Sequence, residues 1–235
     1  MPGLSRHPPS DTLHVMMGKD GRGCRHKAGM TIVLLLAGCI PAGRPDSRQQ
    51  PFRPSPGETA MCLSDLSAAS VRFRALPDRV TGPGCGQFGT VQLTDIGVPV
   101  TGLGAMQCGV ARAFATWVRE DVAPAAQRTL GSRLLRVETF GTYACRNVVG
   151  SAANAERRSG HALANAVDVG AFRLADGRRV SVLADWNGQD EPTRDFLRAV
   201  RRAACRRFGT VLSPDYNAAH ADHLHLEADR AGFCR

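Results

Sequence analysis

Near its C-terminus the chain reads HADHLHLE at residues 220–227, which places three of its seven histidines within six residues. Histidine side chains can bind a metal, transfer a proton near neutral pH or fill polar positions on a strand. If residues 222–228 form a strand, successive side chains point to opposite faces. The two leucines would then pack toward the core, while His223 and His225 would lie about 7 Å apart on the other face. His220 would lie in the turn before the strand.

A further histidine and a carboxylate lie upstream, in the stretch SGHALANAVD at residues 159–168. Asp168 follows His161 by seven residues and enters an apolar run, which predicts a strand. A partly buried carboxylate without a partner is costly, and a neighbouring cation or metal removes most of that cost. Two histidines and one carboxylate are typical zinc ligands, and three protein ligands leave a fourth position for water. We therefore predict a metal site, against the alternative of satisfied or exposed imidazoles.

Hydrophobic periodicity predicts the elements that must position these side chains. Apolar residues at helical spacing indicate a helix over 105–120, and Pro192, a favoured first-turn residue, indicates another that runs to about 208. Strands are predicted at 90–100, 134–140, 166–172, 178–184, 209–212 and 222–228. The order lacks a regular βαβ rhythm, so the predicted class is α+β, with a small antiparallel sheet and flanking helices.

The composition indicates one folded domain behind an irregular segment. With 235 residues and 43% hydrophobic content, the chain can bury the core of one large or two small domains. Residues 40–57 are rich in Pro, Arg and Ser and lack apolar periodicity, which is typical of a disordered linker. No second linker or internal repeat follows, so we expect residues 58–235 to form a single domain and the protein to be a monomer.

The N-terminus has the pattern of an export signal. Lys and Arg residues between 19 and 27 precede a short apolar run at 28–36, and Leu-Ala-Gly-Cys ends at Cys39. This resembles a bacterial lipobox, which implies that residues 1–39 are a signal sequence with Cys39 as the lipidated residue. The alternative of a transmembrane anchor needs about 20 apolar residues, roughly twice this run. The methionines at 16, 17 and 30 are alternative start sites.

The charge pattern gives little support to a nucleic-acid partner. The first 38 residues hold five of the 30 Lys and Arg and two of the 21 Asp and Glu, so the chain from Cys39 onward has a net charge of about +6. A basic surface suits anionic polymers of the cell envelope, but it equally suits ordinary solubility. Aromatic residues are few and are not interleaved with the arginines, so we expect no nucleic-acid binding.

The cysteine content agrees with export. An even number of cysteines in an exported chain favours disulfide bonds, and the absence of a CxxC pair argues against zinc-ribbon and thioredoxin-like proteins. Besides Cys24 and Cys39, the cysteines are Cys62, Cys85, Cys108, Cys145, Cys205 and Cys234. Pairing between chain neighbours predicts the bonds Cys62–Cys85, Cys108–Cys145 and Cys205–Cys234, although sequence alone does not fix the connectivity.

The motifs resemble two known groups. SxHxxxxAxD at 159–168, followed by HxH at 223–225, resembles the metallopeptidases that include lysostaphin, the D-alanyl-D-alanine carboxypeptidases and the zinc site of hedgehog proteins. That pattern usually has Gly where this chain has Ala164. Most of residues 60–235 resembles the bacterial extensin-like C-terminal domain family, through Tyr143-Ala-Cys-Arg146, Ser159-Gly-His161, Asp185-Trp186, residues 210–217, residues 220–227 and Cys234. The resemblance implies a disulfide-stabilised fold like that of hedgehog proteins and D-alanyl-D-alanine peptidases.

The resemblance also implies a zinc site and a substrate contact. His161, Asp168 and His225 match the zinc ligands of the metallopeptidases. Arg146 falls where these enzymes hold a substrate carboxylate or an oxyanion, a role that suits a planar guanidinium. An ordinary surface arginine is the alternative for Arg146. Ser159 is expected either to hydrogen-bond near the site or to cap the following turn.

The general base stays open. His223 matches the residue that assists the attacking water or stabilises the tetrahedral oxyanion. His220 stands three positions earlier, as in the penicillin-insensitive murein endopeptidases with their HxxHxH ending. Some relatives use a Glu near this place, and this chain has none there. The order of candidates is therefore His223, then His220, then Asp222.

These implications define two functional hypotheses. The first is a zinc-dependent peptidase or amidase that acts on peptidoglycan peptides. Zinc lowers the pKa of bound water toward about 7, an imidazole takes the proton, and the hydroxide attacks a polarised carbonyl. The second is a non-catalytic wall-binding or structural lipoprotein that keeps the zinc site. Both place the protein on the periplasmic side of the cell envelope, held at a membrane by its N-terminal lipid.

Overall fold

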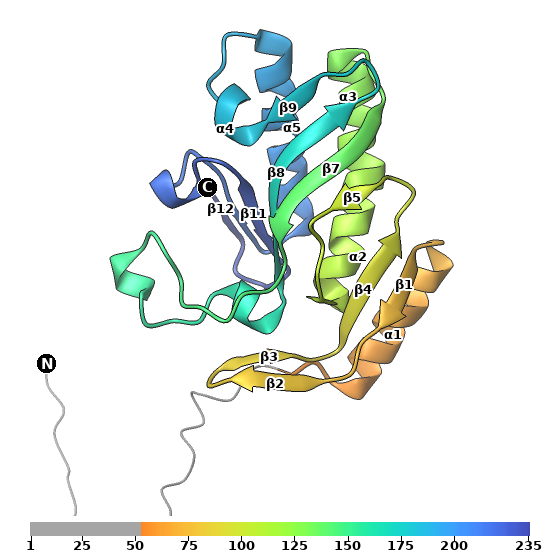
Figure 1. Ribbon diagram of the computed structural model, residues 1–235, viewed down its shortest axis with the longest axis vertical. Helices are drawn as coiled ribbons and strands as arrows, with labels where there is room; N and C mark the ends of the chain where they lie inside the picture. Colours follow the sequence, from red (N-terminus) through yellow and green to blue (C-terminus); the bar gives the residue numbers. More distant parts are fainter. Residues whose placement is uncertain (1–52) are drawn as a thin grey trace, which may run out of the picture. The chain divides into compact units, whose positions relative to one another are not determined.

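The computed structural model describes residues 53–235 (Figure 1). The predicted signal sequence, its lipidation site at Cys39 and most of the predicted linker lie outside the described residues. In the described part, no helix combines the length and the apolar content needed to cross a membrane. Helices and largely antiparallel sheets occur together, which confirms the predicted α+β class.

The largest sheet has seven strands and carries two of the predicted metal ligands, Asp168 and His225. Its order is β12-β10-β11-β8-β7-β5, and β9 also pairs with β8. The inner pairs are antiparallel, whereas the short outer strands β5 and β12 pair in parallel with their neighbours. The strands are β5 (Val100–Thr101), β7 (Leu134–Gly141), β8 (Ala166–Leu174), β9 (Arg179–Ser181), β10 (Thr210–Leu212), β11 (Leu224–Glu227) and β12 (Phe233–Cys234).

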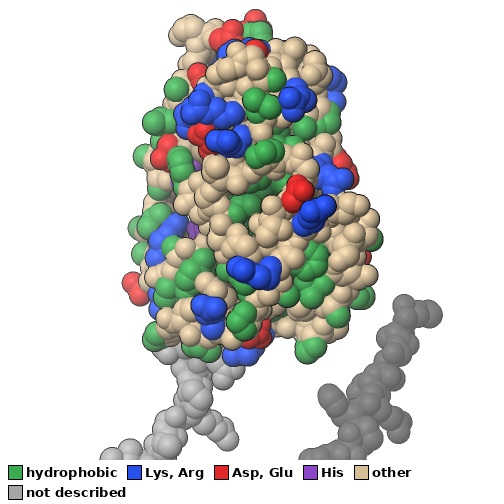
Figure 2. All heavy atoms as spheres, turned by 45° about the vertical axis from the view of Figure 1, so that its right-hand side comes forward, with side chains coloured by type: hydrophobic (Ala, Val, Ile, Leu, Met, Phe, Trp, Pro, Cys, Tyr) green, Lys and Arg blue, Asp and Glu red, His purple; other side chains and the backbone are tan. Residues whose placement is uncertain are grey.

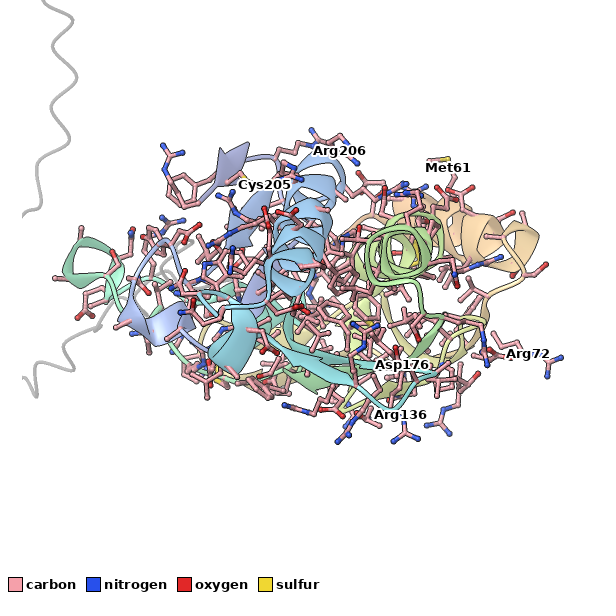
Figure 3. The ribbon with its side chains drawn as sticks, turned by 90° about the horizontal axis from the view of Figure 1, so that it is seen from above. Met61, Arg72, Arg136, Asp176, Cys205 and Arg206 are labelled. Atoms are coloured by element: carbon pink, nitrogen blue, oxygen red, sulfur yellow. A yellow bond between two sulfur atoms is a disulfide. The ribbon has the colours of Figure 1, made fainter. Side chains whose placement is uncertain are left out.

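Helices cover one face of this sheet, as Figures 1 and 3 show. Trp117 lies at the centre of this layer, with its ring edge-on to Phe172 and Phe208 and its Nε1–H donating to the Val200 carbonyl at 3.0 Å. The helices are α2 (Cys108–Trp117), the π-helical turn η2 (Val118–Val122), α3 (Ala123–Leu130), α4 (Val182–Asp185) and α5 (Glu191–Arg207). Because the apolar side chains of β8 and β11 point into this core, their polar side chains are left on the opposite face.

The N-terminal part of the described chain packs beside this core. A three-stranded sheet contains β1 (Arg72–Ala75), β4 (Thr90–Asp95) and β6 (Met106–Gln107), and a hairpin contains β2 (Arg79–Gly82) and β3 (Cys85–Gln87). Helix α1 (Pro56–Ala68) begins with a capping box, in which Ser55 and Glu58 each accept a hydrogen bond from the other's backbone N–H. The fold therefore begins inside the range 40–57 that the composition assigns to the linker.

Short 3-10 turns complete the described chain. They are η3 (Ala152–Asn154), η4 (Gly160–Leu163) and η5 (Ala218–His220). Two of them, η4 and η5, each carry a histidine of the predicted site. The loops between strands, and not only the strands themselves, therefore carry side chains of the predicted site.

Most predicted elements are present, and two of the differences have clear local causes. The strand predicted at 90–100 ends at Asp95, whose carboxylate accepts the backbone N–H of Gly97 at 2.8 Å in a turn where Gly97 has φ 84°. The strand predicted at 178–184 ends at Ser181, because its hydroxyl caps the first turn of α4.

The predicted helix at 105–120 is longer than expected. It begins at Cys108 and continues without a break through η2 and α3 to Leu130. Pro124 is tolerated because it lies in the first turn of α3, directly after the π-helical turn. The segment ends at Gly131, which adopts the left-handed conformation typical of a helix C-terminus.

Three disulfide bonds are present, but two of the predicted pairings are wrong. The observed bonds are Cys62–Cys108, Cys85–Cys145 and Cys205–Cys234, and only the last agrees with pairing between neighbours. Cys62 pairs with Cys108 because α1 packs on α2. The second bond ties the hairpin strand β3 to the segment before Arg146.

Loss of the bond between Cys85 and Cys145 is expected to lower the free energy of unfolding by roughly 2–5 kcal/mol. This bond joins residues 60 positions apart, the buried Cys85 and the exposed Cys145, so its loss removes a constraint on the unfolded chain. Urea unfolding of the double variant Cys85→Ser/Cys145→Ser measures the effect. Peptide mapping without reduction should first recover the three observed pairs in the unsubstituted protein. Recovery of Cys62 joined to Cys85 would contradict the structure.

Candidate metal centre

Asp168 on β8 and His225 on β11 are direct partners across two neighbouring antiparallel strands. Alternation along β11 buries Leu224 and Leu226 completely on the helix-covered side, as predicted from the sequence. The carboxylate and the imidazole therefore share the opposite face of the sheet. Sheet pairing alone is sufficient to bring together residues that are 57 positions apart.

His161 reaches the same place from the turn η4. The hydroxyl of Ser159 accepts the backbone N–H of His161 at 3.4 Å, so this serine caps the turn. The turn ends at Ala164, which has φ 54°, a left-handed conformation that favours glycine. This is the position at which the metallopeptidase pattern has Gly. An alanine adopts this conformation here.

The three side chains meet in a tight, buried group. The Nε2 atom of His161 lies 3.0 Å from Oδ2 of Asp168 and 3.1 Å from Nδ1 of His225. The same Nδ1 atom lies 2.8 Å from Oδ1 of Asp168. The exposed fraction of each residue is 9% or less. The structure therefore brings together the three predicted ligands as a group that could hold a metal ion.

Hydrogen bonds between these side chains shift the pKa values of Asp168 and His225 in opposite directions. Burial alone would raise the pKa of Asp168, but hydrogen bonds from His161 and His225 outweigh it and hold this pKa far below its ordinary value. Burial alone would lower the pKa of His225, but the carboxylates of Asp168 and Glu227 raise it to about 9. Asp168 is thus an anion, and in the absence of metal His225 is a cation at neutral pH.

His223 and His220 lie on the open side of this group. The ring centroid of His220 is 5.2 Å from that of His223 and 5.7 Å from that of His225. The Nε2 atom of His223 lies 3.5 Å from Oδ1 of Asp168. These three histidines form a second group that could hold a metal, and it shares His225 with the first.

A side-chain acceptor anchors each of these two rings. Nδ1–H of His223 donates to Asp222 at 2.7 Å, and Nδ1–H of His220 donates to Oδ1 of Asn217 at 2.7 Å. The amide of Asn217 is oriented by its own donation to the carbonyl of Gly150. Both histidines therefore have Nε2 as their free nitrogen. Asp222, third in the order of base candidates, therefore orients His223.

His220 has a lowered pKa. Burial, followed by the positive charge of His225 and His223, lowers the pKa of His220 to about 4. The ring is therefore neutral at physiological pH. It can accept a hydrogen bond or bind a metal through Nε2, but it carries no positive charge to stabilise an oxyanion.

Glu227 is the residue of this site whose role the sequence does not reveal. Its Oε1 accepts the Nε2–H of His225 at 2.7 Å. Burial alone would raise the pKa of Glu227, but this hydrogen bond and the charge of His225 outweigh it and lower the pKa. The alternation of β11 places residue 227 on the same face as residue 225. This alternation was the available sequence signal for Glu227, but it does not show which nitrogen of His225 the carboxylate contacts.

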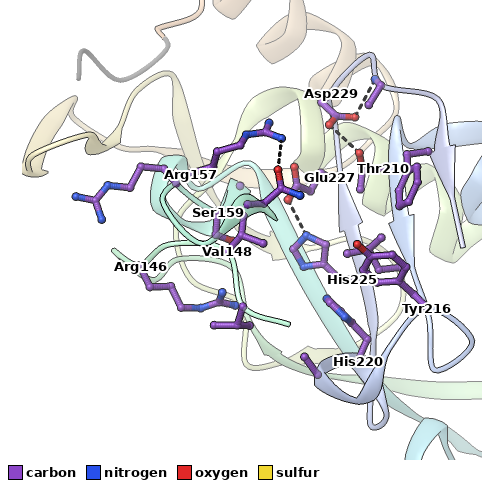
Figure 4. Close-up of a pocket in the computed structure, with 18 of the residues that line it drawn as sticks. Arg146, Val148, Arg157, Ser159, Thr210, Tyr216, His220, His225, Glu227 and Asp229 are labelled. Atoms are coloured by element: carbon purple, nitrogen blue, oxygen red, sulfur yellow. Dashed lines mark hydrogen bonds and ion pairs between the residues drawn. The ribbon is translucent and has the colours of Figure 1, made fainter. Parts of the chain in front are cut away.

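Arg146 lines a pocket of ≈ 420 Å³ next to the histidines. Figure 4 shows Arg146 and Arg157 on one side of this pocket and His220 and Tyr216 on the other. The backbone carbonyl of Arg146 accepts the N–H of Ser159, so this segment runs along η4. Its guanidinium makes only a long hydrogen bond, 3.3 Å, to a backbone carbonyl, and within residues 53–235 it forms no ion pair.

The Asp185-Trp186 and 215–217 motifs have structural contacts. Trp186 is buried, its Nε1–H donates to Asp215 at 2.8 Å, and the guanidinium of Arg198 lies 3.8 Å from its ring. Asp215 also pairs with Arg198. These contacts hold the loop that leads to His220, and they place neither motif among the ligand groups. Elsewhere on the surface of residues 53–235 arginines are scattered, as Figure 2 shows for one face.

Without metal, the protein is expected to lose stability as the pH rises from about 6.5 to 9. The folded-state pKa of His225 is about 9, against an ordinary value of 6.5. The stabilisation is fully present below pH 6.5 and is lost as the pH rises through the folded-state pKa. Urea unfolding of chelator-treated protein at several pH values measures this slope. The slope should be shallower in His225→Asn, and a free energy of unfolding that increases toward pH 9 would contradict the expectation.

Comparison with known proteins identifies the family. No match is found among curated proteins or among solved structures. A family model described as Extensin-like protein C-terminus matches residues 60–235, which include every residue of both ligand groups. The match runs from within α1 to the last residue. The chain therefore belongs to the extensin-like protein C-terminus family.

Proposed function

We propose that the protein is a zinc-dependent peptidase or amidase that acts on peptides of the cell wall. The observation that carries the proposal is the buried group of His161, Asp168 and His225 with a further histidine, His223, on its open side. The first three are suited to hold the metal, and the fourth is suited to move a proton.

The donor set fits zinc in chemistry and in size. Two imidazole nitrogens and a carboxylate oxygen are common zinc donors, and in a tetrahedral site with bonds of about 2.0–2.1 Å they lie roughly 3.3 Å apart. Here Nε2 of His161 and Nδ1 of His225 are 3.1 Å apart, and each lies close to a different oxygen of Asp168, at 3.0 Å from Oδ2 and 2.8 Å from Oδ1 respectively. Three protein ligands beside a pocket are typical of a catalytic zinc site. Bound zinc would supply Lewis acidity, which makes water more acidic and polarises a carbonyl.

His223 is the better candidate for the proton acceptor. Asp222 holds its Nδ1–H, which leaves the lone pair of Nε2 free beside the ligand group. A carboxylate behind an imidazole also stabilises the cation that forms when the ring takes a proton. His220 has a neutral amide in the corresponding place, and its pKa of about 4 makes it a weaker base.

The pocket favours a substrate with an anionic or carbonyl group. Arg146 has no carboxylate partner in the described chain, and its planar guanidinium can hold a substrate carboxylate by two hydrogen bonds. Cell-wall peptides end in carboxylates, and the lipobox at Cys39 would hold the protein in the envelope where they occur. The proposed location is accordingly the periplasmic side of the envelope, with a lipid anchor and a monomeric protein.

One observation favours the second candidate function, a non-catalytic wall-binding or structural lipoprotein that keeps zinc. Glu227 is the glutamate closest to the ligands, and its carboxylate is engaged with Nε2 of His225. It is therefore not free to serve as the glutamate base used by some of the metallopeptidases. On this alternative the pocket would bind envelope polymer without cleavage.

The test measures metal content and turnover on the same preparation. We expect the purified protein to retain about one zinc per chain after dialysis, and to release new amine groups from purified peptidoglycan peptides. Chelation should abolish the release, and added zinc should restore it. Zinc without cleavage of any wall peptide would favour the binding protein, and absence of zinc would contradict both candidates.

A further inference from the structure

Glu227 lies on the side of His225 that faces away from the other two ligands. It accepts a hydrogen bond from Nε2, while Nδ1 of the same ring lies against His161 and Asp168. We propose that Glu227 is a positioning residue, which fixes the tautomer and the orientation of His225 so that Nδ1 is the nitrogen offered to a metal. The proposal rests on the metal-binding part of the proposed function and is independent of hydrolysis.

The need for such a residue follows from the contacts of Nδ1. A metal binds the neutral form of an imidazole, which carries its single N–H on one of its two nitrogens. Asp168 is an acceptor 2.8 Å from Nδ1, so on its own it would draw that proton to Nδ1, and this tautomer cannot bind a metal there. Glu227 is an acceptor 2.7 Å from Nε2 and draws the proton to the other side. Acceptors behind metal-binding histidines commonly have this effect.

Gly160, in the turn that carries His161, leaves the space that the Glu227 carboxylate occupies. A Cβ atom on Gly160 would lie 2.5–2.8 Å from the Glu227 carboxylate, which is closer than atoms can approach. Gly160 is not among the glycines with positive φ, so its lack of a side chain serves space and not backbone conformation. One turn thus delivers a ligand and leaves room for the carboxylate behind another ligand.

The first test compares two substitutions of the carboxylate. Glu227→Ala is expected to weaken zinc affinity by about 10–100-fold, measured by competition with a chelator of known affinity. Glu227→Gln keeps an oxygen that can accept from Nε2–H and should recover most of the loss. Glu156→Ala, at an exposed glutamate, is the matched control and should leave the affinity unchanged.

The second test displaces the Glu227 carboxylate through a substitution at Gly160 and leaves Glu227 itself unchanged. Gly160→Ala should displace Glu227 and weaken zinc affinity by a factor similar to that of Glu227→Ala. The double variant should lose little more than either single variant, because both act on one contact. Gly109→Ala is the control, since Gly109 has open space around its missing Cβ and no positive φ.

The outcomes separate positioning from structural support. Wild-type zinc affinity in Glu227→Ala would overturn the proposal, as would equal losses in the alanine and glutamine variants together with equal falls in the unfolding temperature of the metal-free protein. Rescue by glutamine at an unchanged unfolding temperature supports it. If the unsubstituted protein binds zinc but cleaves no wall peptide, hydrolysis fails as a function and the role of Glu227 is still decided by these affinities.

Discussion

Replacing Asp168 by asparagine is expected to weaken zinc binding by more than about 100-fold. Asp168 is the only anionic donor in its group, and in the metal-free protein its carboxylate contacts both His161 and His225. Asparagine keeps nearly the same volume but offers a neutral amide, which is a poor zinc ligand. Zinc content after dialysis against a weak chelator measures the loss. Asp195→Asn, at an exposed position of α5, should retain zinc and serves as the control.

Replacing Asp168 by alanine should also destabilise the metal-free protein, by about 3–5 kcal/mol near pH 6, because a buried cation loses its partner. The pKa of Asp168 is held far below its ordinary value of 3.8. Its contribution is therefore present above pH 3.8 and is lost as the pH falls through the lower folded-state pKa. Urea unfolding at pH 6 measures this loss. An equally stable alanine variant would contradict the electrostatic role.

If the metal is bound by the second group, a different result is expected for Asp168→Asn. If Asp168→Asn retains zinc with unchanged affinity, the metal is bound by His220, His223 and His225, whose ligand atoms also lie within 4.8 Å of one another. In that case His220→Ala would release zinc and His161→Ala would not. The two groups share only His225, so these single variants distinguish them.

The parts of the site that follow from strand alternation could be predicted from the sequence. A period of two separates Leu224 and Leu226 from His225, and the structure keeps this separation. The strand predicted to begin at 222 begins at Leu224, so His223 lies just before it. An apolar run around Asp168 likewise indicates a strand, and β8 is present there. Such local patterns are readable because the side-chain period of a strand does not depend on its neighbours.

The parts that depend on packing between distant segments could not be predicted. Helix α1 buries only Leu66 and lacks an apolar stripe, so hydrophobic periodicity does not predict it. The pairing of Cys62 with Cys108 depends on this helix. The contact between Glu227 and Gly160 depends likewise on how η4 meets β11. No spacing in the sequence encodes these distances.

Replacing His223 by alanine is expected to lower the rate of peptide hydrolysis by about 10²–10⁴-fold while leaving zinc bound. His223 lies beside the ligand group but outside it, and its free Nε2 is held in place by Asp222. Removal of a proton acceptor slows the chemical step, whereas removal of a ligand releases the metal. The rate with a defined wall peptide and the zinc content of the same sample are the two measurements.

Two further variants assign the base among its candidates. Asp222→Asn keeps the ring of His223 in place but removes the charge behind it, so the rate should fall by less than in His223→Ala. His220→Ala should have the smaller effect of the two histidine variants, because its low pKa makes His220 a weak base at neutral pH. Added imidazole should restore part of the activity of His223→Ala, since a small base can enter the space that the side chain leaves. A larger loss in His220→Ala, with zinc retained, would transfer the role of general base to His220.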